Sequence, residues 1–189
     1  MKAGLRQRLR ARRRDFVARM NAAGTISEAA EAMAARVIAQ RGEARTIATY
    51  WPAGSEADSR PAMLALHARG CVVALPHVTS PDQPMTFHRW QPGDTLHSGA
   101  HGLLQPATDT APIEDFDLIL TPLLGFDRRL MRLGQGAGYY DRLFARLPHI
   151  RRIGLAWSVQ EVEEAPADPW DVPLHGVATE LEWIEAEPR

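Results

Sequence analysis

The 189-residue sequence has little of what marks several large classes of protein. It has one cysteine, Cys71, so no intrachain disulfide can form, as is usual in a reducing compartment. No apolar run reaches the length of a membrane span, and the N-terminus lacks the apolar segment of a secretory signal. The formal net charge is −1, so overall charge favours no polyanionic partner. We therefore expect a cytoplasmic protein that binds neither membrane nor nucleic acid.

The common arrangements of catalytic side chains are also missing. There is no Walker A Gly-Lys-Ser/Thr and no nucleophile-turn serine with His and Asp partners. Among the seven histidines, only His97 and His101 have a metal-ligand spacing, and their place in a glycine-containing loop gives a zinc site little support. The chemistry is therefore expected to depend on positioning and charge.

Strand-like and helix-like segments alternate along the chain, and 45% of the residues are hydrophobic. We predict an α/β fold: one three-layer domain over residues 1–189, with a mostly parallel sheet, helices on both faces and a basic N-terminal helix. The predicted helices are 2–22, 28–40 (capped by Ser27), 59–70 and from 140 to about 147; the predicted strands are 46–51, 71–78, 85–90, 117–124, 152–157 and 176–184. In such sheets ligands bind beyond the carboxyl ends of the strands.

The most informative segment is 132–142, where three glycines alternate with other residues between a predicted strand and a predicted helix. Glycine lets the backbone adopt positive φ and lets a ligand approach its N–H groups, and a helix start adds unpaired N–H donors. Arg132 adds a cation, and Asp141 adds a carboxylate that suits a metal ion bound to phosphate. A tight turn without a ligand is the alternative. The glycine spacing fits a dinucleotide fingerprint poorly.

The segment from Arg132 to Arg142 resembles the signature of the 5-formyltetrahydrofolate cyclo-ligase (5,10-methenyltetrahydrofolate synthetase) family. Further resemblances follow in the family's order along nearly the whole chain. They are Lys2 to Arg6, Tyr50 to Ser59, Ala74-Leu75-Pro76, Gly125-Phe126-Asp127, Gln160, Asp171-Val172-Pro173 and Thr179-Glu180.

The resemblance implies Mg²⁺ as metal ion, ATP as co-substrate and 5-formyltetrahydrofolate, with or without a polyglutamate tail, as substrate. The implied ATP-binding residues are Lys2, Arg6, Arg132, Leu133, Gly134, Gln135, Gly136, Ala137, Gly138, Tyr139 and Tyr140. The implied folate-binding residues are Trp51, Glu56 and the loop residues Gln135, Gly136, Ala137, Gly138 and Tyr139. The implied metal ligands are Asp141 and Asp171, and Phe126 is expected to pack against the folate.

On this basis we expect a monomeric ligase that cyclises 5-formyltetrahydrofolate to 5,10-methenyltetrahydrofolate and releases ADP and phosphate. The alternative is a diverged, non-catalytic regulator that binds a nucleotide or phosphate on the same fold. The arginines of the N-terminal helix have two further interpretations, a solvated basic face or an RNA-binding surface, and the latter rests on charge alone.

Six positions depart from the family's usual pattern, and the mildest departure is Ser59, where threonine is usual. Gln135 and Ala137 stand where the loop often has a cationic or aromatic residue, and Leu130 stands where glycine is frequent. His77 replaces a usual arginine and His175 a usual aspartate. The exchange at His77 is expected to matter most, since a permanent charge becomes a titratable one. We expect these changes to affect folate binding more than the ATP site.

Overall fold

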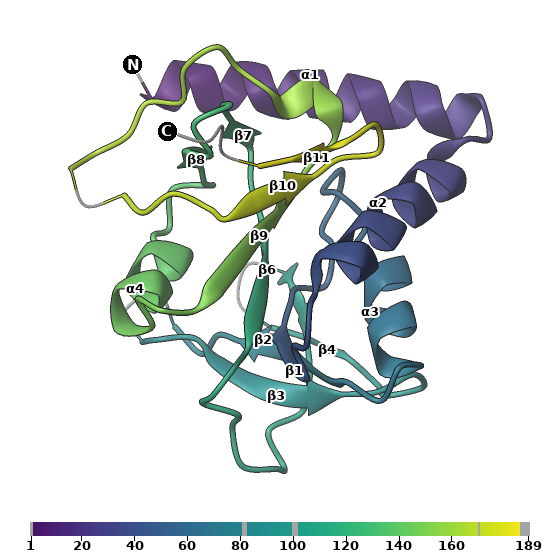
Figure 1. The fold of residues 1–189 in the computed structure, drawn as a ribbon, viewed down its shortest axis with the longest axis vertical. Helices are drawn as coiled ribbons and strands as arrows, with labels where there is room; N and C mark the ends of the chain where they lie inside the picture. Colours follow the sequence, from purple (N-terminus) through teal and green to yellow (C-terminus); the bar gives the residue numbers. More distant parts are fainter. Residues whose placement is uncertain (1, 81–82, 100–101, 170, 186–189) are drawn as a thin grey trace.

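The computed structural model describes residues 2–80, 83–99, 102–169 and 171–185 (Figure 1). A seven-stranded sheet with the order β11-β10-β9-β6-β1-β2-β3 forms the centre of the molecule. Its inner strand pairs are parallel, and the pairs at the two edges are antiparallel. The strands are β1 (Thr46–Ala48), β2 (Val72–His77), β3 (Thr86–Trp90), β6 (Leu118–Pro122), β9 (Arg151–Leu155), β10 (Gly176–Ala178) and β11 (Trp183–Ile184).

The order of the strands places a topological switch between β1 and β6. From β1 the chain builds outward through β2 to β3, whereas from β6 it builds the other way through β9 and β10. Connections that leave neighbouring parallel strands in opposite directions open a crevice beyond their carboxyl ends. The fold therefore predicts a ligand site next to Thr49, which follows β1, and Pro122, which ends β6.

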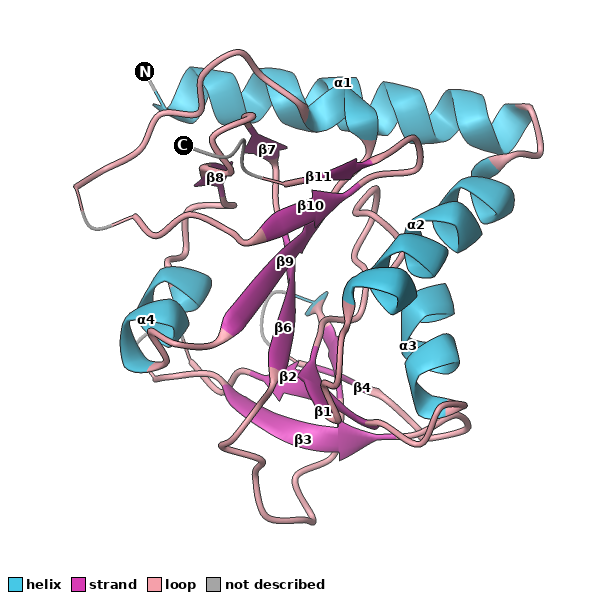
Figure 2. Cartoon of the chain, viewed as in Figure 1, coloured by secondary structure: helices cyan, strands magenta, loops and turns pink. Residues whose placement is uncertain are grey.

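Helices cover both faces of the sheet, as Figure 2 shows. They are α1 (Lys2–Ala22), α2 (Ile26–Gln40), α3 (Arg60–His67) and α4 (Tyr139–Arg146), with a short 3₁₀ turn, η2 (Ser158–Gln160). Alternate residues of β1 and β6 enter two different apolar clusters, because successive strand side chains point to opposite faces. Ile47 packs with Met33 of α2 and Met63 of α3, while Ala48 packs with the cluster that contains Phe144 of α4. The predicted α/β fold with helices on both faces is thus confirmed.

The first helix is long, basic and mostly exposed. Of its side chains only Leu9 and Arg13 are buried. Phe16 packs against Trp157 with ring centroids 5.6 Å apart, and Val17 adds to the same cluster. Helix α1 runs along one end of the sheet (Figure 1) and is held there by few apolar contacts, so polar contacts must contribute much of its docking.

Several predicted boundaries are wrong. Helix α2 begins at Ile26, so Ser27 lies inside it rather than capping it, and Thr25 occupies the N-cap position. The predicted strand 176–184 is a hairpin, because Thr179 Oγ1 accepts hydrogen bonds from the N–H groups of Leu181 and Glu182 and turns the chain. The surface region 91–113 contains a small hairpin of β4 (His97–Ser98) and β5 (Leu104–Gln105). Another hairpin, β7 (Gly125–Phe126) and β8 (Arg132–Leu133), leads into the glycine segment.

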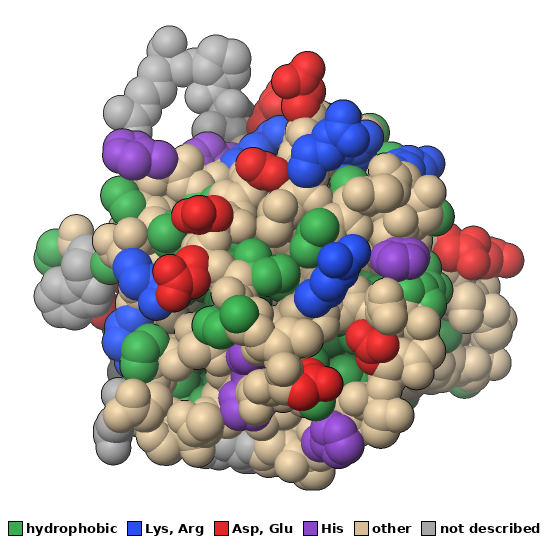
Figure 3. All heavy atoms as spheres, turned by 90° about the horizontal axis from the view of Figure 1, so that it is seen from below, with side chains coloured by type: hydrophobic (Ala, Val, Ile, Leu, Met, Phe, Trp, Pro, Cys, Tyr) green, Lys and Arg blue, Asp and Glu red, His purple; other side chains and the backbone are tan. Residues whose placement is uncertain are grey.

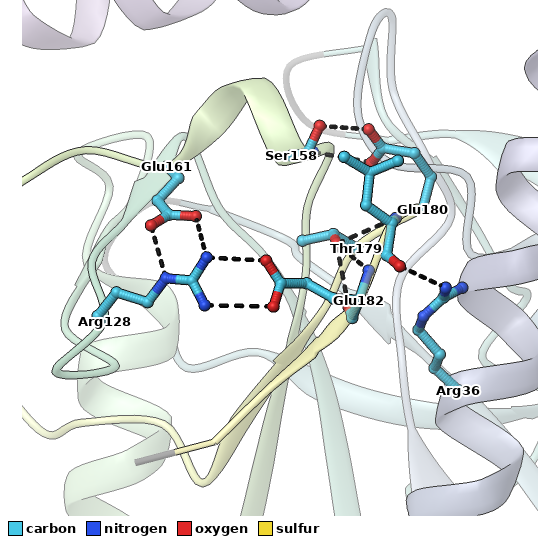
Figure 4. A network of polar contacts seen from close by, with 8 residues as sticks. Arg36, Arg128, Ser158, Glu161, Thr179, Glu180 and Glu182 are labelled. Carbon is cyan, nitrogen blue, oxygen red and sulfur yellow. Dashed lines mark hydrogen bonds and ion pairs between the residues drawn. The ribbon is translucent and has the colours of Figure 1, made fainter. Parts of the chain in front are cut away.

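Polar contacts join the β10–β11 turn to its neighbours (Figure 4). The exposed guanidinium of Arg128 lies 2.7 Å from a Glu161 oxygen and 2.8 Å from a Glu182 oxygen. Ser158 donates its N–H and its hydroxyl to the two oxygens of Glu180. These contacts tie the segment after β9 to the turn that ends the sheet.

None of the helices in the described ranges is both long and apolar enough to cross a bilayer. On the face shown in Figure 3, acidic, basic, histidine and hydrophobic side chains are interspersed.

Candidate active site

A cavity of about 580 Å³ lies at the switch point between β1 and β6. Its floor includes Tyr50 and Trp51, which follow β1, and Pro122 at the end of β6; α1 and the segment 132–141 form two of its walls. Apart from Phe126, every residue that the sequence suggested for ATP, folate or metal binding lines this cavity. The structure therefore brings together segments that are far apart in the chain, while the ligand of each residue stays a prediction.

The glycine segment, residues 134–138, has the backbone that its sequence suggested. Gly136 has a φ of 110° and Gly138 a φ of 71°, values that side-chain-bearing residues rarely adopt. Gly138 is the N-cap of α4, so the unpaired amides of the first helical turn face the same region. The amides of Gln135, Gly136 and Gly138 donate to no acceptor in the described part of the chain. These donors are available to an anion in the cavity.

Three of the cations that line the cavity were predicted from the sequence: Lys2, Arg6 and Arg132. Arg132 is 7% exposed, and its side chain donates to Asp141 and to the carbonyl of Val172 at 3.2 Å. Burial lowers the pKa of Arg132, while the nearby Asp141 and Asp171 carboxylates oppose that shift. Lys2 Nζ lies 2.6 Å from an Asp168 oxygen, and Arg6 Nε donates to the Gly134 carbonyl at 3.0 Å.

The carboxylates near these cations suit a metal ion that is also bound to phosphate. Asp171 accepts the backbone N–H of Asp168 at 2.7 Å and lies 3.6 Å from Lys2 Nζ. Among the described residues, no group of three or more His, Cys, Asp or Glu side chains is placed to hold a metal alone. Magnesium needs few protein ligands when phosphate oxygens and water complete its shell. Asp141 and Asp171, both close to Arg132, fit that requirement.

Glu56 marks the other part of the cavity. Its carboxylate accepts the N–H of Ala53 at 3.0 Å and the amide of Gln135 at 3.3 Å. Burial raises its pKa, while the Ala53 hydrogen bond and the guanidinium of Arg13 oppose the shift. A half-buried carboxylate with oxygen lone pairs facing a cavity is suited to accept ligand N–H groups. The apolar residues beside it include Trp51, Pro76, Val78 and Met85.

Sequence reasoning missed two charged residues of this cavity, Arg13 and Asp168. Arg13 is 5% exposed; it donates to Ser55 Oγ at 3.1 Å and to the Leu123 carbonyl at 3.4 Å. A signal was present, since Lys2, Arg6 and Arg13 share one face of α1 at helical spacings of four and seven. Asp168 lies in a proline-rich segment and gives no comparable signal.

Other expectations need correction. Phe126 is completely buried in the core and does not line the cavity, so it is not placed to pack against a ligand. His77 lies edge-on to His88, with ring centroids 5.8 Å apart, and burial lowers its pKa. His175 Nδ1 accepts the N–H of Arg152 at 3.0 Å. Within the described residues, neither histidine nor Leu130 is part of the cavity wall, so these departures do not alter the site directly. His101, which with His97 has a metal-ligand spacing in the sequence, lies outside the described residues.

These features define a class: an α/β protein with a deep cavity at the switch point of its sheet, faced by a glycine segment, a helix start and several arginines. The family model of the 5-formyltetrahydrofolate cyclo-ligase family matches residues 1–180. The chain belongs to this family of ligases.

Relatives and solved structures agree. The 5-formyltetrahydrofolate cyclo-ligase of Haemophilus influenzae is 30% identical over 154 residues, which are 76% of this chain and 80% of that protein. The Escherichia coli enzyme of the same name is 32% identical over 143 residues, 72% of this chain and 78% of that one. The NMR structure of Aquifex aeolicus 5,10-methenyltetrahydrofolate synthetase matches with a TM-score of 0.78 at 26% identity, covering 100% of this chain and 94% of that one. The 5,10-methenyltetrahydrofolate synthetase of Mycoplasma pneumoniae matches with a TM-score of 0.72 at 25% identity, over 95% and 98% of the two chains.

Proposed function

We propose that this chain uses ATP and Mg²⁺ to cyclise 5-formyltetrahydrofolate to 5,10-methenyltetrahydrofolate, with release of ADP and phosphate. One observation carries the proposal: a single cavity joins a cationic, amide-rich region around residues 132–138 to a region with the Glu56 carboxylate and apolar walls. The first region suits a polyphosphate, and the second suits a ring system with N–H donors.

The reaction needs two substrates in contact. The formyl oxygen on N5 attacks the γ-phosphorus of ATP, the bond to ADP breaks, and the formyl carbon becomes electrophilic. N10 then forms a bond to that carbon and loses its proton, and the C–O bond breaks with departure of phosphate, which carries that proton away. No side-chain nucleophile is required, so the enzyme contributes mainly alignment and charge stabilisation.

The cations and amides would hold the triphosphate. Lys2, Arg6 and Arg132 neutralise phosphate oxygens, and the amides of the glycine segment donate to them. Because Lys2 is paired with Asp168 and Asp171 here, binding of phosphate requires Lys2 to exchange carboxylates for phosphate oxygens. Asp141 and Asp171 would hold Mg²⁺, which would add positive charge beside the phosphate oxygens.

The Glu56 region would hold the pterin. Its carboxylate accepts hydrogen bonds from the amino and ring N–H groups, and Trp51 forms one wall of the pocket. Trp51 also packs against Trp90, with ring centroids 6.3 Å apart, so its orientation is set by the core. Gln135 bonds to Glu56 from the glycine segment, and it therefore connects the two substrate regions.

The test is the near-ultraviolet absorbance of the methenyl product when purified protein is mixed with 5-formyltetrahydrofolate, ATP and Mg²⁺. We expect growth that requires all three, and its loss in Asp141→Asn with the fold retained. Asp115→Asn is the matched control, because Asp115 is exposed and lies outside the cavity. Absence of product from a folded protein that still binds Mg-ATP would overturn the proposal and favour a nucleotide-binding regulator.

A further inference from the structure

Three carbonyl oxygens of the glycine segment each accept a hydrogen bond from an arginine of a helix. The pairs are Arg6 Nε with Gly134 O at 3.0 Å, Arg10 Nη2 with Gln135 O at 3.3 Å, and Arg142 Nη1 with Ala137 O at 3.2 Å. Arg6 and Arg10 belong to α1, and Arg142 belongs to α4. The segment is thus held from two helices at once.

The direction of these bonds determines where the amides point. The described peptide bonds are all trans, and in a trans peptide unit the C=O and the following N–H point in opposite directions. Arg10 and Arg142 are not among the residues that line the cavity, whereas Gly136 and Gly138 are. With the carbonyls of Gln135 and Ala137 turned towards these arginines, the amides of Gly136 and Gly138 are turned towards the cavity.

The two positive-φ glycines also make room for arginines. A Cβ on Gly138 would lie 3.0 Å from Arg142 Nη1, and a Cβ on Gly136 would lie 3.4 Å from Arg6 Cζ. Backbone conformation and close side-chain approach therefore both favour glycine at these positions. The arginines pack on the segment as well as bonding to it.

The charge of this region comes from outside the segment. Gln135 and Ala137 carry none, and the three arginines that bond to the segment's carbonyl oxygens belong to α1 and α4. Arg10 Nε also donates to Gln135 Oε1 at 3.2 Å. The Gln135 side chain in turn donates from Nε2 to the Glu56 carboxylate at 3.3 Å. Arg10 therefore holds the backbone and the side chain of Gln135 together.

We propose that Arg10 and Arg142 are positioning residues for the triphosphate: they turn the Gly136 and Gly138 amides into the cavity and supply charge that the segment lacks. This inference rests on the proposed function, since it assigns the polyphosphate of ATP to these amides. Two arginines of α1 then have different roles: Arg6 lines the cavity, whereas Arg10 contacts the glycine segment without lining the cavity.

The test measures Mg-ATP binding directly, by calorimetry, in Arg10→Gln, Arg142→Gln and the double variant. Because both arginines are exposed and screened by solvent, each single change is expected to weaken binding by about two- to fivefold, and the double change by about tenfold. Arg8→Gln, an exposed change on α1, is the control and should bind as wild type. Arg142→Gln should raise the KM for ATP and leave the KM for 5-formyltetrahydrofolate and the thermal midpoint unchanged.

Arg10→Lys separates position from charge, because lysine keeps the charge but cannot donate from both Nε and Nη2. Continued weakening in Arg10→Lys supports positioning. Wild-type Mg-ATP affinity in both glutamine variants, or an equal rise in the two KM values for Arg142→Gln, would overturn the inference. This failure is distinct from failure of the proposed function, which would appear as tight Mg-ATP binding without methenyl product.

Discussion

Leu130 lies in an unfavourable backbone conformation, and this makes its replacement by glycine informative. Its φ is 64°, the only positive value at a non-glycine position in the described ranges, and its side chain is 2% exposed. The surrounding turn holds it there: Leu130 N donates to the Asp127 carbonyl at 2.9 Å, and Leu174 N donates to the Leu130 carbonyl at 2.9 Å. Burial of the side chain thus opposes the cost of the left-handed conformation.

The magnitudes can be compared for Leu130→Ala and Leu130→Gly. Loss of a buried leucine side chain to alanine costs about 2–5 kcal/mol of unfolding free energy. Going on from alanine to glycine removes a buried methyl, about 0.8 kcal/mol, and adds unfolded-chain entropy of about 0.4–1 kcal/mol. The same step relieves the left-handed conformation, which costs a Cβ-bearing residue about 1–2 kcal/mol. The two variants are therefore expected to be nearly equal in stability.

Leu123 provides the control, because it is also 2% exposed and its φ is not positive. There the glycine variant is expected to be less stable than the alanine variant by about 1–2 kcal/mol, since no conformational strain is relieved. Urea unfolding of the four variants measures both differences. An equal alanine-to-glycine loss of unfolding free energy at Leu130 and Leu123 would mean that Leu130 carries no conformational strain.

Two further predictions concern buried carboxylates. Since burial raises the pKa of Glu56 above its usual 4.5, wild type loses stability as pH rises through the raised pKa. Glu56→Gln should therefore raise the thermal midpoint at pH 8 but hardly below pH 4.5, while weakening folate binding; a pH-independent difference would contradict this. Asp127 is fully buried and accepts the N–H groups of Arg129, Met131 and Ala165, so Asp127→Ala should cost about 3–5 kcal/mol in urea unfolding. Asp127 also forms an ion pair with the exposed guanidinium of Arg129, 2.9 Å away. Arg129→Ala should cost far less than Asp127→Ala, and equal losses would mean that the ion pair dominates.

The sequence allowed the class of fold and the location of the site to be predicted, because both depend on local signals. Alternating strands and helices predicted the parallel sheet, and the glycines at 134, 136 and 138 predicted a turn with unusual φ before α4. The predicted site residues came mainly from the family resemblance, and the structure collects them on one cavity. The ligand of each residue stays a prediction.

The features that could not be predicted depend on long-range contacts. Lys2 and Asp168 are 166 positions apart, and nothing in either local sequence indicates that they meet. The hairpin at 176–184 was missed because its turn is set by the Thr179 hydroxyl rather than by glycine or proline. His77 looked important from its position after Leu75-Pro76, but strand alternation turns it towards His88 while Pro76 lines the cavity.

The polar docking of α1 has a consequence for the order in which the protein is completed during synthesis. Arg13, Arg6 and Lys2 reach partners 110, 128 and 166 positions later in the chain. The ribosome therefore releases this basic helix long before the groups that receive it exist. The contact between Lys2 and Asp168 can form only after residue 168 has emerged, so a truncated chain that contains the whole glycine segment still lacks part of the cavity wall.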